Sequence, residues 1–359
     1  MAWTPPPDWT RITTIDCHAA GEPLRVITGG FPPIPGDTIL AKRRYAREHL
    51  DHLRRALIFE PRGHADMYGC IFTEPATPDG DLGVLFMHNE GYSTMCGHGI
   101  IGLVTVALET GMLAPRVAEA VRIDTPAGRV TARARFDGKR VRSVAFENVP
   151  SFAYALDQTV DVPGIGRVKV DVGFGGAFYA YCKAVDLGVR VVPEDFRRLI
   201  DAGVAVKHAV MASLPIVHPF EPDMGFLYGT IIDGPPHAPD AHSRNVCIFA
   251  DGEVDRSPTG TGVSGRIALE HAKGRLSIGE PFVVESLIGT RFAGRIVRTT
   301  TFGEHEAVIP EVEGSAWITG HNEFWIAPDD PLKDGFILRF IGNCRDDGHI
   351  WRLTQANSR

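Results

Sequence analysis

The sequence has no run of about 18 apolar residues, the length that a membrane-spanning helix needs. Its first eight residues include three consecutive prolines and no apolar stretch, so we do not expect a signal peptide. Six cysteines in 359 residues are too few for a disulfide scaffold, and none lie two or three positions apart as in zinc knuckles or thioredoxin-type pairs. We therefore expect a globular, cytoplasmic protein with no membrane attachment, in which most thiols are buried.

The sequence also lacks an excess of positive charge. Its formal net charge is −7, which gives no electrostatic footprint for nucleic acid. The phosphate loop G-x-x-x-x-G-K-[ST] is absent, and the glycine-rich turn at 97–102 lacks the following strand and acidic residue of a dinucleotide site. The 14 histidines are scattered and form no H-E-x-x-H motif, so we predict no metal and no cofactor. A small molecule is the partner that we expect.

The chain is long enough for about two domains of ~150 residues. Glycine and proline interrupt many short stretches with strand character, and few stretches have a helical period. This pattern is typical of a mixed α/β (α+β) protein. One short apolar run, Ala56–Glu60, is among the predicted strands. The predicted helices are Asp37–His49, Ile100–Gly111, Pro193–Ala212 and Gly262–Gly274.

An internal repeat divides the chain. The stretch Cys96–Gly102 has the pattern X-G-X-G-apolar-X-G, and the pattern recurs 163 residues later at Thr259–Gly265. Helix-compatible residues and a stop glycine follow each copy. The first helix is apolar nearly all round, which is typical of a buried central helix. The repeat favours two similar halves, each a curved sheet around a helix, over two unrelated glycine-rich turns.

The two repeated turns place Cys96 and Thr259 at helix N-termini. Such an end leaves about four backbone N–H groups unpaired, and its dipole favours negative charge. Two such ends facing each other would form a cage for a carboxylate. The same dipole lowers the pKa of a thiol, so we expect Cys96 to be a thiolate near neutral pH. The alternative is that Cys96 is a small core residue, but polar and glycine neighbours speak against it.

Other polar residues are more ambiguous. Asp255 lies four residues before Thr259 and would accept hydrogen bonds from a substrate ammonium, hold Arg256, or cap the turn. His18 and His88 are candidates for pocket residues, although an isolated histidine is more often a satisfied structural group.

These motifs closely resemble those of the proline racemase family. Met95-Cys96-Gly97-His98-Gly99 is similar to the family's first catalytic motif, and Asp255-Arg256-Ser257-Pro258-Thr259-Gly260-Thr261-Gly262 is similar to its second. The resemblance covers almost the whole chain. Further matching stretches lie at 16–23, 60–67, 124–128, 148–152, 175–179 and 249–252.

The resemblance implies a fold like that of diaminopimelate epimerase, with two pseudo-symmetric halves and the site between them. We expect an N-terminal half at 1–155, joined by the C-terminal segment 335–359, and a C-terminal half at 156–334. The resemblance also implies a homodimer.

The family's racemases and epimerases carry a cysteine in both motifs, whereas this chain has Thr259 in the second. That departure is the one that the family shows in its trans-3-hydroxy-L-proline dehydratases. The resemblance assigns Asp255 to the ring nitrogen of the substrate. It assigns the substrate carboxylate to the backbone of Gly97, His98, Gly260 and Thr261.

A single cysteine suits dehydration better than racemisation. Racemisation exchanges a proton between two faces and needs two acid/base groups, and a threonine hydroxyl is too weak to be one of them. In trans-3-hydroxy-L-proline the hydroxyl lies on the same ring face as the Cα hydrogen, so Cys96 alone can serve as base and then as acid. Thr259 would position the substrate. The alternatives are a proline racemase or 4-hydroxyproline 2-epimerase, a non-catalytic cyclic amino-acid binder, and a redox protein that would lack a nearby resolving cysteine.

Overall fold

A computed structural model describes residues 3–114, 119–138 and 140–338. Residues 339–359 of the predicted C-terminal segment 335–359, with Cys344, lie outside the described residues. Among the described helices, none combines the length and the apolar character needed to cross a bilayer.

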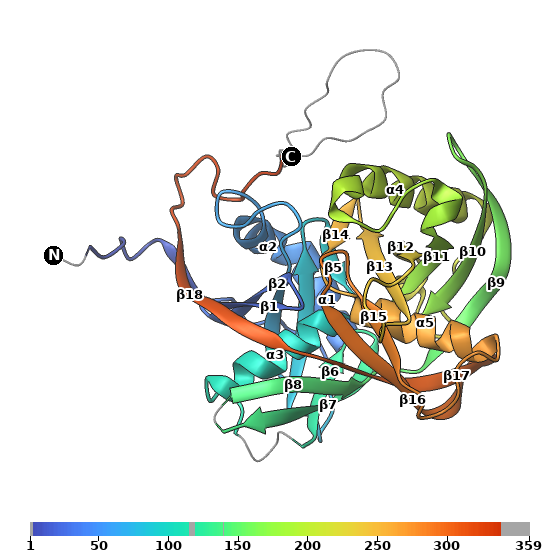
Figure 1. The fold of residues 1–359 in the computed structure, drawn as a ribbon. Coiled ribbons are helices and arrows are strands. Elements are labelled where there is room, and N and C mark those ends of the chain that lie inside the picture. The colour runs from blue at the N-terminus through green and yellow to red at the C-terminus, as the bar shows by residue number, and fades with distance from the viewer. Residues whose placement is uncertain (1–2, 115–118, 139, 339–359) are drawn as a thin grey trace, which may run out of the picture.

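The N-terminal part is a curved sheet with α3 on its inner face (Figure 1). The strands β1 to β4 and then β6 to β8 lie side by side in chain order, with β2–β3 and β4–β6 parallel and the other neighbours antiparallel. Helix α3 packs mainly against β1 and β8. The bounds of these elements are β1 Thr10–Ala19, β2 Glu22–Gly29, α1 Ile39–His49, α2 Asp51–Ile58, β3 Gly69–Thr73, β4 Leu82–His88, β5 Gly91–Ser93, α3 Gly97–Glu109, β6 Val121–Thr125, β7 Gly128–Asp137 and β8 Arg140–Glu147.

The C-terminal part is a closed barrel around α5. Strands β9 to β13 lie side by side, β15, β16 and β17 continue the sheet, and β17 returns to pair with β9. Helix α5 packs against β9, β10, β16 and β17, and α4 packs against β12 and β13 (Figure 1). The bounds are β9 Ser151–Val162, β10 Gly166–Phe174, β11 Phe178–Lys183, η2 Ala184–Leu187, η3 Pro193–Asp195, α4 Phe196–Ser213, η4 Pro222–Met224, β12 Leu227–Gly234, β13 Ser243–Phe249, β14 Glu253–Asp255, α5 Gly260–Ala272, β15 Phe282–Glu285, β16 Arg291–Phe302, β17 His305–Gly314 and β18 Ala316–Ile326.

Two strand pairings join the parts. Strand β17 pairs with β8 as well as with β9, and β18 pairs with β1 along its whole length. The chain therefore crosses back into the N-terminal sheet after completing the barrel.

The predicted repeat is confirmed by the order of the elements. In the first copy the hairpin β4–β5 leads into α3, and β6 then runs parallel to β4. In the second copy the hairpin β13–β14 leads into α5, and β15 runs parallel to β13. This correspondence gives the mixed α+β fold two similar halves, each a curved sheet around a central helix.

The predicted central helix α3 is buried on every side, as its composition requires. All residues from Gly97 to Leu108 are buried. The helix begins three residues before the predicted Ile100, because Cys96 is the N-cap and its sulfur accepts a hydrogen bond from Gly99 N. The glycines of the motif therefore form the first helical turn rather than a preceding loop.

One predicted strand is wrong. The run Ala56–Glu60 lies largely in helix α2, whose buried residues include Leu53, Ala56 and Leu57. This spacing puts the three side chains on one helix face, and a short apolar run taken alone does not distinguish helix from strand. The strands β9, β17 and β18 and the short strands β5 and β14 were not predicted.

Candidate active site

The N-termini of α3 and α5 meet in the middle of the molecule. A Cβ atom added to Gly97 would lie 2.5 Å from the Cα of Gly260, and one added to Gly260 would lie 2.7 Å from the Cα of Gly97. No side chain fits at either position without moving a helix. The two glycines therefore allow two sets of helix-terminal N–H groups to converge on one place.

A cavity with about 300 Å³ of atom-free space lies at this meeting point. All seven predicted site residues line it, so the structure brings together the two motifs that the sequence separates. These are Cys96, Gly97, His98, Asp255, Thr259, Gly260 and Thr261. The cavity is also lined by Tyr68, Met95, Tyr179, Tyr228, Cys247 and Phe249.

The Cys96 thiol is held by backbone and side-chain contacts. Its sulfur accepts a hydrogen bond from Gly99 N at 3.2 Å and lies 3.2 Å from His98 Nδ1. Burial raises the pKa of Cys96 well above its ordinary value, and the negative charge of Asp255 raises it further. The predicted thiolate near neutral pH is therefore wrong for this state of the site. The Gly99 N–H does lower the pKa, but desolvation outweighs it.

His98 lies between the thiol and the carboxylate of Asp255. Its Nδ1 is 4.0 Å from Asp255 Oδ2 as well as 3.2 Å from the Cys96 sulfur. Burial lowers the pKa of His98 to about 4. The imidazole is thus neutral at neutral pH and has one N–H to donate and one nitrogen to accept.

Asp255 ends β14 and faces the cavity. Its Oδ1 accepts a hydrogen bond from Ser257 N at 2.7 Å, so this oxygen does cap the turn into α5. Its other oxygen faces His98. Arg256 bonds instead to Glu22, with Nε 3.0 Å from Glu22 Oε2, so Asp255 does not have the role of holding Arg256. One carboxylate oxygen is left in position for a ligand.

Thr259 starts α5 in a strained conformation. Its φ angle is 64°, in the left-handed region that a β-branched residue rarely adopts. Its hydroxyl is buried, makes no hydrogen bond of ordinary length and does not cap the helix, in contrast to the capping sulfur of Cys96. Its longer-range polar neighbour is the Cys247 thiol. Strain of this kind concentrates at functional sites. The free hydroxyl is available to a molecule in the cavity.

The cavity also has an aromatic wall and a second thiol, which the sequence did not predict. Tyr68 and Tyr228 form part of the wall, and the thiol is Cys247 on β13. Burial raises the pKa of Cys247 well above its ordinary value. For two other wall residues the sequence did offer a signal, because they lie in stretches that match the family. Tyr179 ends the stretch 175–179, and Phe249 begins the stretch 249–252.

Neither of the two ambiguous histidines lines the cavity. The Nδ1 of His88 lies 3.1 Å from Glu253 Oε1, and its ring stacks on Tyr68 behind the aromatic wall. The Nδ1 of His18 accepts a hydrogen bond from Gly21 N at 3.2 Å, and its ring stacks on Trp317. Both histidines therefore have structural partners.

Known proteins are similar to this chain over nearly its whole length. The profile of the family described as "Proline racemase" matches residues 14–337. A "Trans-3-hydroxy-L-proline dehydratase" of Colwellia psychrerythraea is 50% identical over 92% of this chain and 94% of its own length. A "3-hydroxyproline 2-epimerase" of Burkholderia multivorans is 47% identical over 91% of this chain and 98% of its own.

Solved structures agree with this relationship. The crystal structure of a hydroxyproline epimerase from Agrobacterium vitis, with bound trans-4-hydroxy-L-proline, superposes with a TM-score of 0.86. It is 31% identical and covers 94% of this chain and 97% of its own. Fold and sequence both match over nearly the whole length, and the chain belongs to the proline racemase family.

Proposed function

We propose that this protein dehydrates trans-3-hydroxy-L-proline to Δ2-pyrroline-2-carboxylate and water, and that the product tautomerises to Δ1-pyrroline-2-carboxylate. One observation carries the proposal: Cys96 begins α3 at the cavity, whereas the equivalent position on α5 holds Thr259. The site therefore offers a motif thiol to one face of a bound ring and a hydroxyl to the other. Several relatives at about half identity carry the name of this dehydratase, which supports the proposal.

The two helix ends supply the electrostatic part of the reaction. The backbone N–H groups of Gly97, His98, Gly260 and Thr261 hold the substrate carboxylate, and Asp255 holds the ring nitrogen. When the Cα proton leaves, negative charge spreads onto the carboxylate as an enediolate. Donors already aimed at those oxygens stabilise that charge without reorganising.

Cys96 handles the proton. A positively charged ring nitrogen next to the thiol favours the thiolate, which offsets part of the desolvation that raises the pKa. The thiolate takes the Cα proton, and the electron pair of the C–H bond moves onto the carboxylate. The C3–O bond then breaks as the C2=C3 bond forms. The thiol returns the proton to the leaving oxygen, so water departs and the thiolate is regenerated without pyridoxal phosphate or a metal.

Epimerisation at Cα is the second candidate, and Cys247 is the observation that favours it. This thiol lines the same cavity from β13, on the side of α5. A relative named 3-hydroxyproline 2-epimerase has similar identity. A proton delivered from the α5 side to the ring would invert Cα.

The roles of the two thiols are tested by paired serine variants. We expect Cys96→Ser to lose at least about 10²-fold in kcat for dehydration, since general acid–base catalysis contributes about that much. Cys247→Ser should keep near-normal dehydration and is the matched control, because the same atom is changed at a buried site in the same cavity. Near-normal dehydration by Cys96→Ser would refute the proposal. Loss of Cα inversion in Cys247→Ser, with inversion present in the parent, would establish the epimerase instead.

We also propose that the protein is a cytoplasmic homodimer and acts as two functional halves, 1–155 with 335–359 and 156–334. Two strands cross this division: β9 begins at Ser151, and β18 pairs with β1 of the N-terminal sheet. The site takes one motif from each half, that of Cys96 and that of Thr259, which supports the division. The five described cysteines are free thiols, which suits a reducing compartment. The homodimer rests on the family resemblance, and sedimentation of the purified chain tests it.

A further inference from the structure

We infer that Tyr228 donates a hydrogen bond to the ring 3-hydroxyl of the substrate, and that this contact selects 3-hydroxylated prolines over proline itself. The inference rests on the proposed dehydration and names the group that recognises the departing hydroxyl.

The Tyr228 hydroxyl makes no hydrogen bond of ordinary length. Most polar side chains on the cavity wall have a partner: Tyr179 bonds to Thr261 at 2.7 Å, and Tyr68 bonds to the hydroxyl of Ser93. Among the cavity-lining residues that the structure describes, only Thr259 and Tyr228 have buried side-chain oxygens that make no hydrogen bond of ordinary length. At longer range Thr259 interacts with the Cys247 thiol and Tyr228 with the Tyr68 hydroxyl. A buried hydroxyl left unpaired costs free energy, so such groups in a cavity point to a ligand.

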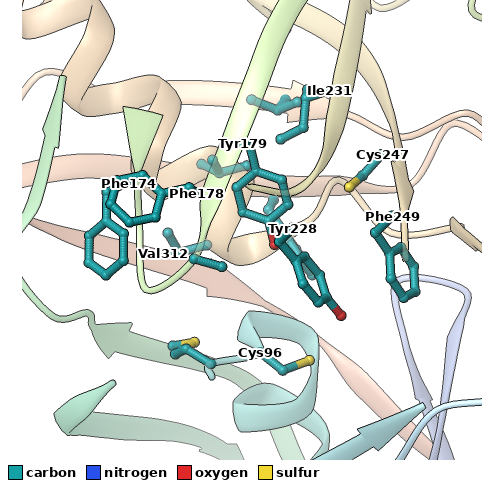
Figure 2. Packing of buried hydrophobic residues seen from close by; sticks show 14 of the residues in the cluster. Cys96, Phe174, Phe178, Tyr179, Tyr228, Ile231, Cys247, Phe249 and Val312 are labelled. Atoms are coloured by element: carbon teal, nitrogen blue, oxygen red, sulfur yellow. The ribbon is translucent and has the colours of Figure 1, made fainter. Parts of the chain in front are cut away.

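The Tyr228 ring is fixed in place. It lies on β12 and is 7% exposed. It stacks on Phe249, with ring centroids 5.3 Å apart. It also forms T-shaped pairs with Tyr179 and His88, with ring centroids 5.7 and 5.8 Å apart. Figure 2 shows the hydroxyl end of Tyr228 turned toward the end of α3 that carries Cys96. A donor on so constrained a ring loses little entropy when it bonds to a substrate.

The stereochemistry of the substrate distinguishes the two free hydroxyls. The 3-hydroxyl of trans-3-hydroxy-L-proline lies on the same ring face as the Cα hydrogen, and that face meets Cys96. Thr259 belongs to the opposite face. The carboxylate and the ring nitrogen already have partners at the helix ends and at Asp255. The Tyr228 ring comes from the barrel strand β12, but its hydroxyl end is turned toward the end of α3 that carries Cys96, and we therefore infer that it reaches the face where the substrate hydroxyl lies.

Tyr228 acts as a donor and keeps its proton. Burial raises the pKa of its phenol well above the ordinary value, so the hydroxyl is neutral throughout the working pH range. The proton that completes the departing water is the one that Cys96 took from Cα. The hydrogen bond from Tyr228 stabilises negative charge on the oxygen as the C3–O bond breaks. Tyr228 transfers no proton in this step.

The test compares Tyr228→Phe with Tyr92→Phe in the full-length protein. Tyr92 is a matched control because its hydroxyl is also buried and unpaired, but its ring belongs to a core cluster away from the cavity. We expect Tyr228→Phe to lower kcat/KM for trans-3-hydroxy-L-proline about 10²-fold or more, as loss of a transition-state donor does. Binding of pyrrole-2-carboxylate, a planar analogue without a ring hydroxyl, should stay within about twofold. Tyr92→Phe should change neither quantity.

Two results would overturn the inference. Unchanged dehydration by Tyr228→Phe would show that the phenol does not contact the departing group. A parallel loss of dehydration and of pyrrole-2-carboxylate binding would show a purely structural role. Failure of the proposed function is distinct, because the parent protein would then release no water from trans-3-hydroxy-L-proline.

Discussion

At the scale of single residues, the structure changes the electrostatic account of Cys96 but not its position. The sequence motif predicts a helix N-cap, and the sulfur does cap α3. The motif does not reveal how completely the barrel and the N-terminal sheet enclose that cap. Burial is a property of the whole fold, so the direction of the pKa shift could not be predicted from the motif alone.

The raised pKa of Cys96 predicts how its alkylation depends on pH. Only the thiolate reacts with iodoacetamide, and burial disfavours the thiolate. The rate of inactivation should therefore rise about tenfold per pH unit from pH 7 to 9 without levelling off. The measurement is the loss of dehydratase activity with time at each pH, with pyrrole-2-carboxylate as the protecting ligand. A rate that levels off below pH 8 would show a lowered pKa.

At the scale of elements, the repeat was visible in the sequence and the crossing strands were not. The two copies of X-G-X-G-apolar-X-G predict two helix starts, and these are the starts of α3 and α5. The strands β17 and β18 alternate polar and apolar residues weakly. Strand β17 forms a hairpin with β16, but its other partners β8 and β9, and the partner β1 of β18, lie far away in sequence. Their pairing is decided by the tertiary fold rather than by local preference.

The close approach of the helix ends predicts the effect of a single methyl group. Gly97→Ala would place a Cβ 2.5 Å from the Cα of Gly260, so α3 and α5 must separate. We expect binding of pyrrole-2-carboxylate to weaken at least about tenfold, since the N–H groups of the cage no longer converge. Titration calorimetry measures the affinity. Gly320→Ala is the control, because an added Cβ there meets only the side chain of Asn322 at 3.7 Å.

Unchanged affinity in Gly97→Ala would contradict the carboxylate cage. The same affinity in Gly320→Ala as in the parent would show that a glycine-to-alanine change alone is harmless.

At the scale of the whole molecule, acid should destabilise the fold through buried neutral histidines. The Nδ1 of His218 accepts hydrogen bonds from Phe220 N and Glu221 N, and burial lowers its pKa from 6.5 to about 4. The unfolded chain binds a proton below about pH 6.5 whereas the folded chain does not, so stability falls as the pH drops from 6.5 toward 4. The whole shift would correspond to at most about 3 kcal/mol near pH 4, and solvent close to the ring reduces it.

Urea unfolding at pH 7 and pH 4.5 measures this loss. We expect His218→Asn, whose amide oxygen can accept the same backbone bonds, to lose less stability between the two pH values than the parent does. His208→Asn, on the exposed face of α4, is the control and should behave like the parent. An equal loss in His218→Asn and in the parent would contradict the assignment to His218.

The central claim is that one thiol at a two-helix cage removes water from a hydroxylated proline. The most direct test is incubation of the purified protein with trans-3-hydroxy-L-proline, trans-4-hydroxy-L-proline and L-proline, followed by detection of the cyclic imine and of the configuration at Cα. We expect Δ1-pyrroline-2-carboxylate from trans-3-hydroxy-L-proline alone. Inversion at Cα of any of the three without formation of the imine would contradict it.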